Sequence, residues 1–139
     1  MADSNGKIVR IGGALAFFED SFYGHPALIR AGADYLVYDY LAEVTMAILS
    51  SAPEEAGGFH PGFLGDVRSY LCEALDKGVK LITNWGGLDP EGAAEALRKL
   101  AAELGRSPRI AVVRGDDLRG RIGDLKARGV REMFDGSAL

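Results

Sequence analysis

Two carboxylates, Asp39 and Glu43, stand where an active site could use them. Asp39 ends an apolar, aromatic-rich run that begins at Tyr35, and a helical pattern opens with Glu43 and Thr45. Ligands of open α/β sheets bind at the carboxyl ends of parallel strands. Because Glu43 lies one helical turn beyond Asp39, both can face the same loop and transfer protons there. The alternative is that Asp39 and Thr45 only cap a helix.

Two further apolar runs also end on polar residues. Asn84 ends one run, and Asp116 with Asp117 ends another. We take Asp116 as a third candidate catalytic carboxylate. The alternative is that the pair is a helix cap followed by a first-turn acid, and this structural role fits Asp117 better than catalysis does. Asp116 could also join Asp39 and Glu43 as oxygen ligands of Mg²⁺, but the spacing does not require this. We expect neither a metal nor a cofactor.

Two glycine pairs could bind a ligand through the backbone. The N–H groups of Gly12-Gly13 and of Gly86-Gly87 could hold a carbonyl oxygen or a phosphate, with Asn84 orienting the same group. The alternative for the second pair is a turn ahead of the helix cap. Gly12-Gly13 lacks the third glycine of a dinucleotide fingerprint.

Alternating apolar runs and helical stripes must position these residues. We predict parallel strands near residues 7–12, 35–39, 79–84 and 109–114, in an open Rossmann-like sheet or part of a barrel. Such continuously apolar strands are typical of sheets covered on both faces. Met133-Phe134 could be a fifth strand cut short by the terminus. We expect a parallel sheet to bring five of these residues together in one cleft at its carboxyl edge. They are Gly12, Asp39, Glu43, Asn84 and Asp116.

Capping residues and glycines mark the predicted helices. Asp89 and Pro90 open one helix, which Gly105 ends. The other helices are expected from His25 to near Gly32, from Phe63 to Leu75 with Gly78 after it, and from Leu118 to Leu125 with Gly129 after it. Residues 50–62 fit a mobile surface loop.

Composition is typical of a globular α/β domain over residues 7–139, with residues 1–6 as a disordered N-terminus. The net charge of −4 comes with scattered Lys and Arg, which excludes a nucleic-acid groove. No apolar run spans a membrane and no signal peptide opens the chain. The single cysteine, Cys72, fits a partly buried thiol and a cytoplasmic protein.

Three segments together resemble a known family. They are residues 34–49, residues 82–90 with the run Ile-Thr-Asn-Trp-Gly-Gly-Leu-Asp-Pro, and residues 112–118; residues 11–13 and 18–21 add a similar opening motif. Their order and spacing resemble those of the acyclic terpene utilisation protein A family. The chain departs from the family at Trp85, where a small residue is usual, and at Asp89, where Asn is usual. It also resembles only the N-terminal part of longer members.

The resemblance implies a role in bacterial breakdown of acyclic terpenes such as citronellol and geraniol through acyl-CoA intermediates. A lyase that hydrates or dehydrates a branched acyl-CoA, or a subunit of one, is the activity it suggests. The alternative is a non-catalytic assembly domain that needs a second chain carrying the C-terminal region. We also expect a homo-oligomer or a partner chain, because an interrupted last strand would leave a sheet edge open.

Overall fold

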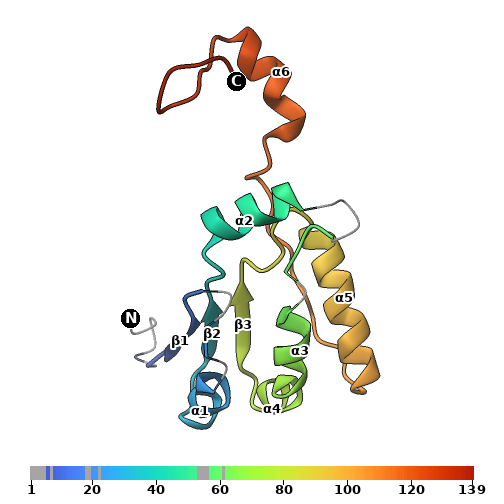
Figure 1. The fold of residues 1–139 in the computed structure, drawn as a ribbon. Helices are drawn as coiled ribbons and strands as arrows, with labels where there is room; N and C mark the ends of the chain where they lie inside the picture. Colours follow the sequence, from blue (N-terminus) through green and yellow to red (C-terminus); the bar gives the residue numbers. More distant parts are fainter. Residues whose placement is uncertain (1–5, 7, 18–19, 22, 53–56, 61) are drawn as a thin grey trace.

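Three parallel strands form an open sheet at the centre of the computed structural model (Figure 1). The strands are β1 (Ile11–Leu15), β2 (Tyr35–Tyr38) and β3 (Lys80–Thr83), in the order β1-β2-β3. Helices alternate with them, so the predicted α/β class is confirmed. The structure describes residues 6, 8–17, 20–21, 23–52, 57–60 and 62–139. The predicted disordered terminus and part of the predicted mobile loop lie outside these residues.

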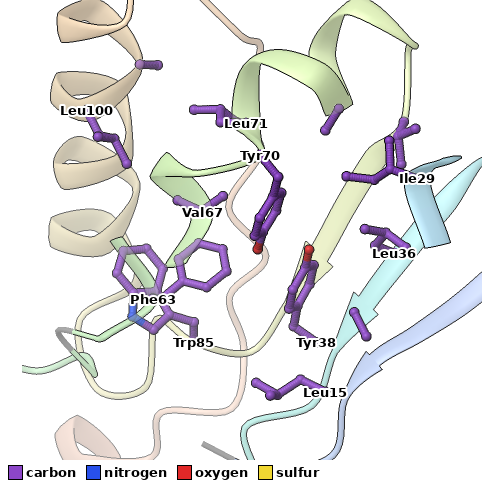
Figure 2. Close-up of a cluster of buried hydrophobic side chains, with 14 of the residues drawn as sticks. Leu15, Ile29, Leu36, Tyr38, Phe63, Val67, Tyr70, Leu71, Trp85 and Leu100 are labelled. Atoms are coloured by element: carbon purple, nitrogen blue, oxygen red, sulfur yellow. The ribbon is translucent and has the colours of Figure 1, made fainter. Parts of the chain in front are cut away.

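Several of the helices pack on one face of the sheet. In β2, Leu36 and Tyr38 are buried, and they join a core with side chains from α1 (Gly24–Arg30), α3 (Gly62–Arg68), α4 (Leu71–Asp76) and α5 (Pro90–Glu103) (Figure 2). On the other face, Ile11 and Ile82 stay exposed although both are apolar. The expectation that both faces are covered is therefore wrong for the described residues.

The fourth strand, predicted at residues 109–114, does not form. The segment is extended but makes no ladder with β3, and Val113 is 90% exposed. Its β-branched composition favours a strand, yet strand formation depends on pairing and burial more than on intrinsic preference. An ion pair between Arg114 and Glu91 instead fastens the segment to the first turn of α5.

The fifth strand predicted at Met133-Phe134 is also absent. Both residues lie in a turn that an isolated antiparallel bridge between Arg131 and Ala138 closes. The side chain of Glu132 accepts the backbone N–H groups of Phe134 and Asp135, so local bonds satisfy the backbone that a strand would have paired.

Capping predicted α5 well. Asp89 is its N-cap and accepts the backbone N–H of Gly92 at 2.9 Å, Pro90 is its first residue, and Gly105 follows its end with a φ of +68°. The helix expected over residues 63–75 is instead split into α3 and α4. The break lies at Tyr70, whose backbone leaves the helical region with φ −133°. It lets this buried aromatic ring stack on that of Tyr38, with ring centroids 6.4 Å apart.

Two helices remain in the described part of the chain, one directly after β2 and one in the C-terminal segment. α2 (Ala42–Ser51) comes directly after β2. A 3₁₀ turn, η2 (Arg119–Arg121), leads into α6 (Ile122–Ala127), which ends before Gly129 as expected. Figure 1 shows α6 and the C-terminal residues projecting away from the sheet.

Candidate functional site

Asp39 and Asn84 meet at the carboxyl edge of the sheet. Each follows the last residue of its strand, and because β2 and β3 are parallel neighbours, their ends lie side by side. The Asn84 side-chain amide donates to Asp39 Oδ1 at 3.1 Å, while its Oδ1 accepts the backbone N–H of Tyr40 at 2.8 Å. The backbone N–H of Leu41 donates to the same Asp39 oxygen at 2.9 Å. An exposed carboxylate is thus held in place through a single oxygen atom.

The turn that carries Asp39 is strained at Leu41. This residue has a φ of +52°, and among the described residues it is the one non-glycine with a positive φ. Side chains disfavour this region, and such outliers persist where the surrounding structure enforces them. Here Thr45 Oγ1 donates to the Tyr40 carbonyl, and the Leu41 N–H is fixed on Asp39. The N-cap position of α2 falls on Leu41, so Asp39 and Thr45 support the turn from outside that position.

Glu43 lies in the first turn of α2, close in sequence to this pair. Its side chain is exposed and borders an apolar face of α2 formed by Val44, Ala47 and Ile48. The structure therefore places a carboxylate beside an apolar surface near the strand ends. Glu43 makes no hydrogen bond to Asp39, whose side chain bonds to Asn84 and the Leu41 N–H instead.

The first glycine pair lies inside β1 instead of after it. Gly12 pairs with Leu36 and Gly13 with Val37, so the predicted strand end at residue 12 is wrong and the strand runs on to Leu15. A Cβ on Gly12 would come within 3.0 Å of Leu36 and 3.1 Å of Leu28. Gly12 thus lets α1 approach the sheet closely, and the pair does not reach the edge where Asp39 and Asn84 meet.

The second glycine pair belongs to a packed turn. The Gly87 N–H donates to the Asn84 carbonyl at 3.2 Å, and the next N–H, from Leu88, donates to the Gly58 carbonyl at 2.7 Å. A side chain on Gly87 would strike Leu49 and the Gly58 carbonyl, and its φ is +50°. The turn alternative therefore accounts for both glycines, although Gly86-Gly87 do lie next to Asn84.

Asp116 lies in the segment that leads to η2. This segment returns to the carboxyl side of the sheet, where Arg114 pairs with Glu91 and Arg119 reaches the Leu88 carbonyl at 3.4 Å. Asp116 is exposed and is not among the hydrogen-bond partners of the Asp39 and Asn84 side chains. Its neighbour Asp117 accepts both the backbone and the side chain of Arg119, and these hydrogen bonds lower the pKa of Asp117 to about 2.

An aromatic cluster lies beneath the strand ends. Trp85 is buried, with its ring centroid 4.6 Å from that of Phe63 and 5.0 Å from that of Phe59. Its indole N–H donates to the His60 carbonyl, and Tyr40 also packs on Phe63. The loop at residues 57–60 is thereby fixed against the β3–α5 turn. Trp85, one of the two positions at which the sequence departs from the family pattern, is thus packed among these rings.

A buried histidine that the sequence did not single out lies below this cluster. His25 is 1% exposed, with its ring centroid 5.0 Å from that of Tyr38 and 5.3 Å from that of Tyr70. Burial lowers the pKa of His25 and raises the pKa of Tyr38 to about 12. Figure 2 shows the hydroxyl groups of Tyr38 and Tyr70 facing one another.

Two further properties of the described residues bear on the site. They hold no group of three or more His, Cys, Asp or Glu side chains placed to share a metal ion. Within the same residues, none of the helices combines the length and apolar character needed to cross a bilayer.

Comparison with known proteins gives a family. The family model described as "Acyclic terpene utilisation family protein AtuA" matches residues 9–139 of this sequence. These residues include the strand ends and turns described above. Comparisons with curated proteins and with solved structures give no significant match. The match extends over nearly the whole chain, and we conclude that this chain belongs to the acyclic terpene utilisation family.

Proposed function

We propose that the chain is an enzyme of acyclic terpene breakdown, or a subunit of one, and that Asp39 is the acid-base group that exchanges a proton with the water that is added to, or lost from, a branched acyl thioester. The observation that carries this proposal is the Asp39–Asn84 pair. Its carboxylate is exposed at the strand ends, where α/β sheets bind ligands, and it is oriented by two hydrogen bonds to Oδ1. Both recorded bonds use one oxygen, which leaves Oδ2 to act on a substrate.

The proposed chemistry is addition or loss of water across a carbon–carbon double bond conjugated to the thioester carbonyl. In hydration, Asp39 takes a proton from water as the water oxygen bonds to the β-carbon. The π electrons move to the carbonyl oxygen and form an enolate, which is then protonated at the α-carbon. Dehydration follows the reverse course.

Two neighbouring side chains fit the other roles. An amide NH₂ has two N–H donors, and Asn84 uses one on Asp39. Its second N–H is the proposed donor to the developing enolate oxygen, since donors placed at such an oxygen lower the barrier. Glu43 is the proposed acid for the α-carbon, and the apolar face of α2 that it borders would contact the hydrocarbon chain.

Binding can be tested whichever direction the reaction takes. We would titrate ¹⁵N-labelled protein with the coenzyme A thioester of geranic acid and follow the Asn84 side-chain amide and the backbone of residues 39–48. Saturable shifts at these signals, absent with coenzyme A alone, are expected. Shifts confined to other regions would contradict this location of the site.

Replacing Glu43 by Gln separates the proposed role from a structural one. We expect Glu43→Gln to lose proton transfer or binding and to keep the wild-type melting temperature, because the side chain is exposed. A purely structural first-turn acid would instead lower stability by roughly 0.3–1 kcal/mol and leave binding intact. Early melting with normal binding would therefore contradict the proposal.

A second function, as an assembly domain, is favoured by the open face of the sheet. Parallel sheets are usually covered on both sides, yet Ile82 is 51% and Ile11 68% exposed here. A second chain packed on this face would bury them. Light scattering at high concentration tests this function, because a monomer that recruits no partner would contradict it.

A further inference from the structure

The end of β1 contains an irregularity beside the proposed site. Gly13 pairs with Val37 and Leu15 pairs with Tyr38, so the register shifts across Ala14. The residue between these two pairs has no partner of its own on β2. Bulges of this kind re-aim a strand and often occur next to active sites.

His25 binds the carbonyl of this extra residue. The ring Nε2 lies 2.8 Å from the Ala14 oxygen, and since a carbonyl only accepts, Nε2 carries the hydrogen. The ring has a fixed orientation. Tyr38 and Tyr70 both pack on it in edge-to-face contacts, and the His25 backbone is part of α1. A buried donor in a fixed orientation thus satisfies the carbonyl that the bulge removes from the ladder.

The residue after the bulge contacts the proposed site directly. The Leu15 carbonyl accepts the backbone N–H of Asp39 at 3.0 Å. Asp39 is therefore held on its backbone by β1 and on its side chain by Asn84 from β3. A shift at Ala14 would move the Leu15 carbonyl and with it the backbone from which the Asp39 carboxylate projects.

We propose that His25 is a positioning residue: by binding the Ala14 carbonyl it fixes the bulge that ends β1, and through the Leu15–Asp39 hydrogen bond it sets the position of the Asp39 carboxylate. The importance of that position for catalysis rests on the function proposed above. The structural linkage itself does not, so it can be tested without a substrate.

The test compares His25→Gln with His25→Asn. A Gln side-chain amide can place its nitrogen near the position of the ring Nε2, whereas the shorter Asn cannot reach it. We would measure backbone amide hydrogen exchange by NMR at Asp39, with Lys80 as the reference. The Lys80 N–H donates to the Asp34 carbonyl at the opposite end of the sheet, so it reports on general loss of stability.

We expect the Asn variant to exchange roughly three- to tenfold faster at Asp39, relative to Lys80, as loss of one ordering hydrogen bond predicts. The Gln variant should restore a rate near that of the wild type and should keep the wild-type chemical shift of the Asn84 side-chain amide. His25→Ala should resemble the Asn variant where it folds.

Three results would overturn the proposal. They are equal acceleration at Asp39 and Lys80, wild-type exchange in the Asn variant, and a Gln variant that unfolds or exchanges as the Asn variant does. Failure of the catalytic proposal would look different. In that case Asp39 variants would keep their activity while the exchange pattern at residue 39 still depended on His25.

Discussion

The two faces of the sheet carry similar side chains but have different surroundings. On one face Leu36 and Tyr38 are buried under the helices, and on the other Ile11 and Ile82 are exposed. An apolar residue in a strand therefore does not by itself show which face holds the core. The polar site lies at neither face but at the carboxyl edge, where Asp39 and Asn84 meet. Burial stabilises the sheet, and in the proposed function the strand ends supply the chemistry.

The largest contrast is expected between matched core and surface truncations. Leu36→Ala should lower the free energy of unfolding by about 2–5 kcal/mol, because Leu36 is fully buried and its loss leaves a cavity. Ile82→Ala, on the neighbouring strand, should cost clearly less because the side chain is half exposed. Urea titration of both variants checks this. Equal losses would mean that the second face is covered in solution.

A smaller loss is expected at the edge. Asn84→Ala removes the bonds to Asp39 and to the Tyr40 N–H, so it should destabilise the fold by roughly 1–2 kcal/mol. Asp116→Ala is the control and should stay within about 0.5 kcal/mol, as is usual for exposed positions. Urea midpoints measure both. If Asp116→Ala lost as much stability as Asn84→Ala, Asp116 would interact with the Asp39–Asn84 pair, which would contradict this account.

The free energy of unfolding should also depend on pH, because His25 is buried in the core on the covered face of the sheet. Burial lowers its pKa below the ordinary 6.5, while the hydrogen bond to the Ala14 carbonyl and the nearby charges of Asp66 and Asp20 oppose the shift. The unfolded chain therefore binds the proton first, and stability should fall as the pH drops from about 6.5 toward the folded pKa. His25→Gln should lose this part of the slope. Melting temperatures from pH 8 to pH 5 test the difference, and parallel curves for both proteins would contradict it.

The weakest effect on folding is expected on the open face. Ile82→Ser should change stability little, because the residue is half exposed, but it should weaken any association through this face. Light scattering over a range of concentrations measures association. If the wild type associates and the Ser variant does so equally well, a different surface is responsible.

Local chemistry predicted part of this structure well. The two ends of α5 could be predicted from Asp89, Pro90 and Gly105, because helix capping depends on residues that are close in the sequence. The meeting of Asp39 and Asn84 also followed, because adjacent parallel strands bring their carboxyl ends together. Both predictions needed only a strand, its direction and the residue that follows it.

Tertiary packing decided the features that the sequence did not reveal. Residues 109–114 have a strand-like composition, but they are fastened to α5 by Arg114 and make no ladder. The break at Tyr70 and the burial of His25 both arise from ring packing against Tyr38, across more than one element. Gly12 resembled a loop glycine, whereas the close approach of Leu28 from α1 explains it.

The most direct test of the central claim is the turnover of the coenzyme A thioester of geranic acid by Asp39→Asn. Asp124→Asn, an exposed change of the same kind on α6, is the matched control. Mass spectrometry in D₂O would follow hydration and deuterium uptake at the α-carbon. We expect the wild type and the control to react alike and Asp39→Asn to be slower by about 10²–10⁴, the range for loss of a general base. Equal turnover by Asp39→Asn, or none by the wild type, would contradict the assignment of Asp39 as the proton-transferring residue.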